Sequence, residues 1–203
     1  MDIMRDIPDK YFELAIVDPP YGIGITKNKR LVNNSLSNWD NKIPDKHYFN
    51  ELFRISQNQI IWGGNYFIEY LKNTRCFISW DKLNHHENYA DCELAWTSFD
   101  KNAKILKYMW DGNRYGFPDR IQGVGKKTIR IHPTQKPVAL YRWLLQNYAK
   151  TGDKIIDTHS GSGSCAIACH IEKHDFLAIE KDPDYHAASV KRLEEVRAQG
   201  VLF

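Results

Sequence analysis

Four consecutive residues, Asp18-Pro19-Pro20-Tyr21, combine a carboxylate, a stiff backbone and an aromatic ring. They follow the apolar run 14–17, which predicts a buried strand whose carboxyl end is where open α/β sheets place ligands. The two prolines fix φ and remove two N–H donors, so the carbonyls and the carboxylate remain as acceptors. This arrangement suits the planar amino group of a base flipped out of a helix, with the ring stacked on the base. A proline-stiffened turn with a structural tyrosine is the alternative.

A second group of residues lies near the C-terminus, where residues 154–157 predict a strand and the Gly-x-Gly turn 161–163 follows. Small side chains in the next segment, a predicted helix, let a ligand approach the backbone closely. Glu180 ends the next predicted strand about twenty residues later, where an acid can accept hydrogen bonds from ribose hydroxyls. The turn and the acid together indicate a nucleoside-containing cofactor. A P-loop and a full dinucleotide fingerprint are disfavoured, because neither Gly-Lys-Ser/Thr nor a third glycine follows.

The segment 100–131 is the most basic part of the chain. It carries eight basic and three acidic residues, which makes it more positive than the whole chain at +3. Aromatic residues are interleaved with these charges, and basic and aromatic side chains together favour phosphates and bases. A solvated basic loop is the alternative. The residues expected to contact nucleic acid are Lys101, Lys104, Lys107, Arg114, Arg120, Lys126, Lys127 and Arg130.

Elements that could position these groups alternate along the chain. Strands are expected at 14–17, 59–62, 76–80, 93–96, 154–157 and 176–180, and helices at 45–56, 65–73, 137–149 and 183–197, with a further helix after the glycine turn. Residues 100–131 read as irregular. This order predicts one α/β domain, residues 1–203, with a doubly wound, mostly parallel sheet and a short insertion at 100–131.

Composition excludes several other classes of protein. Of 203 residues, 42% are hydrophobic and 26% charged, which is typical of a globular chain. No apolar run reaches the about 18 residues of a membrane span, and no secretion signal opens the chain. The four cysteines are scattered, so a reducing cytoplasm is the expected compartment. Cys165, Cys169, His170 and His174 could space metal ligands, but that helix must pack its small residues, so no metal site is expected.

In chain order these motifs resemble the amino-group DNA methyltransferases that use S-adenosylmethionine, in the circularly permuted β-class arrangement. The proline-rich tetrapeptide resembles the catalytic motif, His-Pro-Thr-Gln-Lys-Pro at 132–137 follows, and the glycine turn comes last. Residues 60–65, 80–82 and 91–96 resemble the middle strands of the family, so the resemblance covers nearly the whole chain. The family usually has a strand just upstream of the position matched by Asp2, and we expect the sheet to lack that edge strand.

The resemblance implies a Rossmann-like fold and methyl transfer to an exocyclic amine of DNA. Asp18 and the Pro19 carbonyl would accept the amine hydrogens, and Tyr21 would stack on the base; Pro20 belongs to the same catalytic motif. An aspartate at the first position is associated in this family with adenine, so the N6 amine of a base flipped out of double-stranded DNA is the expected target. Cytosine-N4 or RNA methyl transfer, and a non-catalytic nucleic-acid-binding module, are the alternatives.

The resemblance also implies the cofactor residues. Asp157 and the glycine turn would flank the methionine and ribose parts, Glu180 would take the ribose hydroxyls, and Asp2 would reach the adenine. Thr134 and Lys136 would lie beside the methionine end. Segment 100–131 takes the place of the target-recognition region, and the oligomeric state stays open, with a homodimer as one alternative. The full cofactor set is Asp2, Thr134, Lys136, Asp157, His159, Ser160, Gly161, Ser162, Gly163, Ser164 and Glu180.

Overall fold

The computed structural model describes residues 2–24, 40–84, 90–110, 115–119 and 130–200, without the side chain of Asp2. The strands of the main sheet are β1 (Phe12–Val17), β2 (Ser56–Trp62), β3 (Phe77–Asp81), β4 (Cys92–Thr97), β5 (Lys104–Lys107), β8 (Ile155–Asp157) and β9 (Phe176–Ala178). The helices are α1 (Asp2–Arg5), α2 (Lys46–Ile55), α3 (Val138–Tyr148), α4 (Ser164–Glu172) and α5 (Pro183–Ala198).

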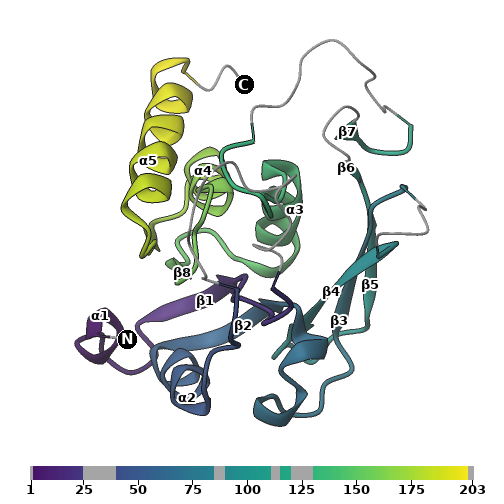
Figure 1. Cartoon of the computed structure of the whole chain (residues 1–203), viewed down its shortest axis with the longest axis vertical. Coiled ribbons are helices and arrows are strands. Elements are labelled where there is room, and N and C mark those ends of the chain that lie inside the picture. Colours follow the sequence, from purple (N-terminus) through teal and green to yellow (C-terminus); the bar gives the residue numbers. More distant parts are fainter. Residues whose placement is uncertain (1, 25–39, 85–89, 111–114, 120–129, 201–203) are drawn as a thin grey trace.

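The seven strands lie in the order β5-β3-β4-β2-β1-β8-β9. Only β4 runs antiparallel to its neighbours, β2 and β3; the other pairs are parallel. Helices α3, α4 and α5 lie on one side of the sheet, whereas α2 lies on the other with α1 beside it (Figure 1). The expected doubly wound, mostly parallel α/β fold is confirmed.

Alternation along β1 divides the core into two layers. Leu14 and Ile16 pack on the side of α3 and α4, whereas Ala15 and Val17 pack on the side of α2, because successive strand residues point to opposite faces. All four side chains are almost fully buried. As the sequence predicts, Asp45 caps α2: its Oδ1 accepts a hydrogen bond of 2.9 Å from the Tyr48 N–H.

Two expectations about single elements were wrong. Segment 100–131 is not wholly irregular, because β5 pairs in parallel with β3 and a small hairpin follows, formed by β6 (Met109–Trp110) and β7 (Tyr115–Gly116). Leu106 of β5 is buried while Ile105 is 67% exposed, so this edge strand buries a single apolar side chain. Such a short hydrophobic pattern is too weak to identify a strand from the sequence. The helix expected at 65–73 is two 3-10 turns, Gly64–Tyr66 and Ile68–Tyr70.

The chain reverses direction across the sheet between β1 and β8. From β1 it proceeds to β2 on one side, and from β8 to β9 on the other, although β1 and β8 are parallel neighbours. Open α/β sheets bind ligands at the carboxyl ends of the strands at such a switch point. The tetrapeptide after β1 and the glycine turn after β8 therefore lie at the same end of adjacent parallel strands, a region called the crevice from here on.

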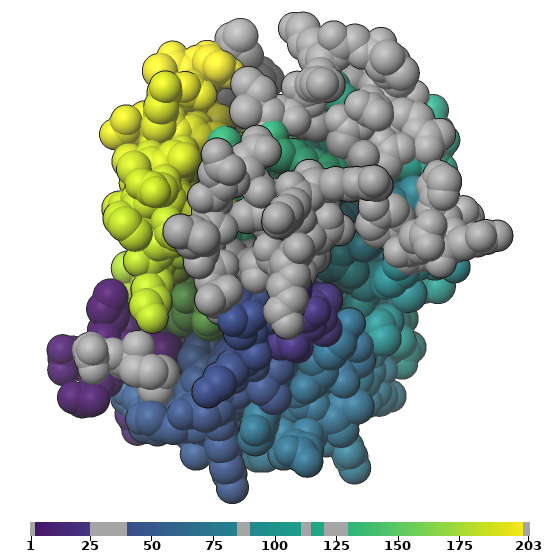
Figure 2. Space-filling model, viewed as in Figure 1, coloured from purple at the N-terminus to yellow at the C-terminus, as the bar shows by residue number. Residues whose placement is uncertain are grey.

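Strand β9 forms one edge of the sheet. Among the described residues it pairs only with β8. Helix α5 runs along this flank of the molecule, and its side chains form the yellow surface in Figure 2. Within the described ranges, no helix has the length and apolar character needed to cross a membrane.

Candidate active site and cofactor cleft

Asp18 is held at both carboxylate oxygens. Its Oδ1 accepts a hydrogen bond of 2.6 Å from the Tyr21 hydroxyl, and its Oδ2 accepts one of 2.5 Å from Lys136 Nζ. Pro19, which lies between Asp18 and Tyr21 in the chain, is buried. Lys136 stands just before α3, so the contact joins two motifs that are far apart in the sequence. The two donors fix the orientation of the carboxylate at the end of β1.

Lys136 also faces a second carboxylate. Its side chain is only 4% exposed, and its Nζ lies 3.0 Å from Glu93 Oε2, while Lys82 Nζ lies 2.7 Å from Glu93 Oε1. Burial would lower the pKa of Lys136, but Asp18 and Glu93 outweigh burial and raise it. Burial would raise the pKa of Glu93, but Lys136 and Lys82 lower it to about 2. Four alternating charges, Lys82–Glu93–Lys136–Asp18, thus line the crevice.

Sequence reasoning did not find Lys82 and Glu93 as site residues. Lys82 follows β3 and Glu93 is the second residue of the antiparallel β4, so both lie at the end of the sheet where the parallel strands finish. Their pairing follows from the order of the strands, which no local pattern predicts. Lys136 was expected beside the methionine end of the cofactor; its described contacts are with Asp18, Glu93 and Tyr21.

The Tyr21 ring packs among other rings. It stacks on Tyr66 with ring centroids 4.9 Å apart and planes 14° apart, and it lies against Phe67. Burial is the main cause that raises the pKa of Tyr21, and the nearby Asp18 adds to it. The hydroxyl therefore stays protonated and donates to Asp18. Stacking of Tyr21 on a base stays a prediction, and Tyr66, 43% exposed, now occupies a stacking position on this ring.

The glycine turn after β8 is closed by Glu180. The Glu180 carboxylate accepts hydrogen bonds from the backbone N–H of Gly161 (2.8 Å) and of Asp182 (2.9 Å). Gly163 has a φ of +72°, a conformation that favours glycine, and a Cβ there would lie 3.0 Å from the Ser189 Cβ. Each Glu180 oxygen keeps a lone pair for a further donor.

Asp157, at the end of β8, is 4% exposed and carries the most perturbed carboxyl group of this turn. Burial raises its pKa to about 8, helped by the neighbouring charges of Asp18 and Glu180. The His159 N–H, 3.0 Å from Asp157 Oδ1, and the Lys136 charge oppose this shift only in part. Asp157 is therefore largely protonated at neutral pH, and a cation brought beside it would favour the ionised form.

The His132–Thr134 segment borders the same turn. A Cβ at Gly161 would lie 3.6 Å from the His132 ring, which packs edge-on against Tyr185 at 4.4 Å. His132 Nδ1 lies 3.1 Å from Thr134 Oγ1. Burial, together with Lys136, lowers the pKa of His132 to about 4, so the ring is neutral at physiological pH. Thr134 thus lies near the turn through its contact with His132, and its place beside the methionine end of a cofactor stays a prediction.

The serines of the turn and His159 face protein groups. Arg192 Nη1 donates hydrogen bonds of 2.9 Å to the Ser162 carbonyl and to Ser164 Oγ. His159 Nδ1 lies 3.0 Å from Thr158 Oγ1, and burial lowers the pKa of His159 to about 4. These contacts stabilise the turn through other protein groups. Direct contact of Ser162, Ser164 and His159 with a cofactor stays a prediction.

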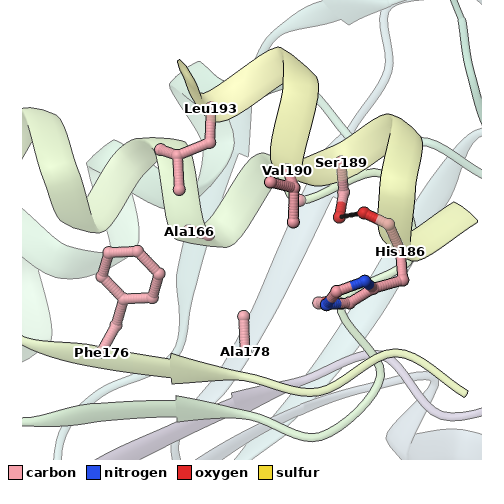
Figure 3. Close-up of a pocket in the computed structure, with 9 residues that line it drawn as sticks. Ala166, Phe176, Ala178, His186, Ser189, Val190 and Leu193 are labelled. Atoms are coloured by element: carbon pink, nitrogen blue, oxygen red, sulfur yellow. Dashed lines mark hydrogen bonds between the residues drawn. The ribbon is translucent and has the colours of Figure 1, made fainter. Parts of the chain in front are cut away.

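A pocket of about 130 Å³ lies between β9 and α5 (Figure 3). Apolar side chains face it from both elements, and Ser160 and Gly163 of the glycine turn reach it at one side. Its volume is small, and neither Asp18 nor Lys136 lines it. The pocket therefore flanks the turn but is separate from the crevice that holds the paired charges. Its lining residues are Ser160, Gly163, Ala166, Phe176, Ala178, His186, Ser189, Val190 and Leu193.

Comparison with known proteins adds to this geometry. A model of the DNA methylase family (N6_N4_Mtase) matches residues 57–191. The chain belongs to the N6/N4 DNA methylase family. It is 25% identical over 233 aligned residues to the type II methyltransferase M2.MboI of Moraxella bovis, covering 97% of this chain and 85% of that protein.

Solved structures share the fold of this DNA methylase. The M1.HpyAVI–SAM complex is similar with a TM-score of 0.58 and 20% identity, covering 94% of each chain. The cytosine-N4-specific PvuII DNA methyltransferase is similar with a TM-score of 0.59 and 11% identity, covering 97% of this chain and 88% of that one. The residues matched by the family model include Glu93, Lys136 and the glycine turn, while Asp18 precedes them.

The described basic residues that are expected to contact DNA lie at separate places on the DNA methylase. Lys101 donates to the Asn147 carbonyl (3.1 Å) and lies over the Tyr148 ring, so it packs on the end of α3. Lys104 starts β5, at the edge of the sheet away from the crevice, whereas Lys107 ends β5 on the crevice side. Arg130 lies over the Trp110 ring. Arg114, Arg120, Lys126, Lys127 and the side chain of Asp2 lie outside the described residues.

Proposed function

We propose that this DNA methylase transfers a methyl group from S-adenosylmethionine to the N6 amine of adenine in double-stranded DNA, with the target base turned out of the helix. The observation that carries the proposal is the Asp18 carboxylate at the switch point, held by Tyr21 and Lys136. Each oxygen keeps a free lone pair. Asp18 and the Pro19 carbonyl can therefore accept the two amine hydrogens and fix the nitrogen in place.

The reaction asks mainly for positioning. The amine lone pair forms the new N–C bond while the C–S bond breaks and its electron pair goes to the neutral thioether; the nitrogen then loses one proton to water. Bound S-adenosylmethionine supplies the methyl group on a sulfonium, which is already activated. Holding two reactants in line is worth several kcal/mol. Asp18 also stabilises the positive charge that develops on the nitrogen.

The residues around the glycine turn fit S-adenosylmethionine. The Asp157 carboxyl group is buried, and its described hydrogen-bond donor is the uncharged backbone N–H of His159. Asp157 would hold the α-ammonium group of S-adenosylmethionine. Glu180 has spare lone pairs for the ribose hydroxyls. Thr134, beside His132 and the turn, would border the methionine end. Asp157 ends β8 and Glu180 follows β9, on one side of the switch point, whereas Asp18 follows β1 on the other.

Cofactor affinity is expected to depend on pH through Asp157. Its pKa of about 8 means that the free protein carries a proton there at neutral pH. A positively charged ligand favours the ionised form, so binding below pH 8 releases a proton and strengthens as pH rises, by up to about tenfold per unit. Calorimetric titration from pH 6 to 8.5 measures this slope. The isosteric Asp157→Asn variant should lose the slope, and an equal slope in both proteins would refute the assignment.

For the DNA side we propose that residues 100–131 form the target-recognition region of a single domain. Lys107 ends β5 on the crevice side, and Arg130 lies over the ring of Trp110, whose Nε1 donates to the carbonyl of Gln135, the residue before Lys136. Phosphate contacts from such residues position a duplex, and rings can stack on bases.

One assay tests the proposed function. Unmethylated genomic DNA and, in a parallel reaction, RNA are incubated with the protein and S-adenosylmethionine labelled in the methyl group, and the digested nucleosides are separated. Label in N6-methyl-2′-deoxyadenosine supports the proposal; label in N4-methyl-2′-deoxycytidine would assign the activity of the PvuII enzyme, whose fold is similar. Label in RNA alone, or in no nucleoside, would overturn it.

A further inference from the structure

Glu93 is the one carboxylate of the described crevice that the proposed chemistry does not use. We infer that Glu93 is a positioning residue for the target amine: it shares the Lys136 ammonium with Asp18 and so leaves the negative charge of Asp18 available to the reacting nitrogen. The inference rests on the proposed function and adds a residue to it.

Geometry around Lys136 Nζ supports this sharing. Three acceptors lie close to it: Asp18 Oδ2 at 2.5 Å, Glu93 Oε2 at 3.0 Å and the Tyr21 hydroxyl at 3.3 Å. Lys136 donates hydrogen bonds to Asp18 and to the Tyr21 hydroxyl, and it forms an ion pair with Glu93. The Trp62 ring lies 5.4 Å from Nζ and the side chain is 4% exposed, so water has little access to replace an acceptor. Without Glu93, the ammonium would bind Asp18 more tightly.

The charges explain why the sharing matters. Asp18 and Lys136 alone form a neutral pair, which attracts a developing positive charge only weakly. With Glu93 included, the three groups carry one net negative charge. Lys82 pairs with Oε1 of Glu93, whereas Lys136 pairs with Oε2. The Lys82 side chain is 18% exposed, so solvent screens its charge from the amine better than it screens the charge of Lys136. Glu93 thus offsets the Lys136 charge where the amine binds.

The same geometry predicts an order of rates among variants that an ion pair needed only for folding would not give. In Lys136→Met, Glu93 and Asp18 face each other without the cation between them. Repulsion between the two carboxylates then disfavours the arrangement in which Asp18 faces the amine, so methyl transfer slows. Adding Glu93→Gln removes that repulsion. The double variant should therefore be faster than Lys136→Met alone, whereas two independent structural losses would make it slower.

The experiment measures kcat, KM and the rate–pH profile in the nucleoside assay for Glu93→Gln, Lys136→Met and the double variant. Glu93→Gln should lower kcat about tenfold or more, as the loss of a charge-assisted contact does, with KM for S-adenosylmethionine within about twofold. Glu172→Gln is the matched control, because its 2.6 Å contact with Arg142 lies between α3 and α4 outside the crevice. That variant should keep the wild-type rate.

The outcomes of this experiment distinguish failure of the inference from failure of the proposed function. An active wild type with an unchanged kcat in Glu93→Gln, or a double variant slower than Lys136→Met, overturns the inference and leaves the proposed function intact. A wild type that labels no nucleoside overturns both. Melting curves and cofactor titration accompany each variant. If Glu93→Gln does not fold, the comparison of Lys136→Met with the double variant, in which both charges are removed, decides the question.

Discussion

Replacing Asp18 with alanine is expected to lower the rate of methyl transfer by about 1000-fold, because preorganised contacts to the reacting group are worth about 100- to 1000-fold each. The carboxylate would accept amine hydrogens and stabilise the charge on the nitrogen, and both effects disappear together. Cofactor binding should change little, since the glycine turn is held by Glu180. Single-turnover rates with labelled cofactor measure the first effect, and calorimetry measures the second.

Two further variants make this prediction sharp. Asp18→Asn keeps the shape and one acceptor oxygen but loses the charge that faces Lys136, so an intermediate rate is expected. Asp9→Ala removes a carboxylate whose side chain is 76% exposed and pairs with Arg54 away from the crevice, and it should match the wild type. Lys136 keeps Glu93 as a partner when Asp18 is removed, so the variant should still fold. Near-normal methyl transfer by Asp18→Ala would remove Asp18 from the mechanism.

The shared crevice could be predicted from the sequence for a physical reason. Each motif follows an apolar run and so marks the carboxyl end of a buried strand, and parallel strands end at the same edge of a sheet. The structure pairs Leu14 with Ile155 and Ala15 with Ile156, so Asp18 and the glycine turn follow adjacent strands. The capping aspartate of α2 and the buried pattern of β1 are local signals of the same kind.

The charge chain could not be predicted, because it depends on long-range order. Glu93 reaches the crevice only because β4 is inserted antiparallel between β2 and β3, which brings its first residues to the edge where its neighbours end. The DNA-binding prediction shows the same limit. Counting charges in 100–131 ignores strand direction, and β5 places Lys104 and Lys107 at opposite ends.

Replacing Gly63 with alanine is expected to destabilise the fold by about 3 kcal/mol, from two causes. Gly63 has a φ of +68°, and an L-residue in that conformation costs about 1–2 kcal/mol. Its Cβ would also lie 2.2 Å from Cε1 of Tyr21, which must move, and overpacking costs about 1–3 kcal/mol more. The Gly63 N–H donates to the Leu94 carbonyl at 2.8 Å, so the backbone is tied to β4 and cannot easily yield.

Gly152→Ala separates the two causes. Gly152 has a φ of +88°, but a Cβ there would meet nothing within 4 Å, so only the backbone strain, about 1 kcal/mol, is expected. By thermal unfolding the Gly63 variant should melt roughly 10 °C below the wild type and the Gly152 variant roughly 3 °C below. Gly63→Ala should also slow methyl transfer, because a displaced Tyr21 withdraws its hydroxyl from Asp18. Equal melting temperatures for the two variants would mean that the close packing of Gly63 against Tyr21 does not hold the segment 18–21 in place.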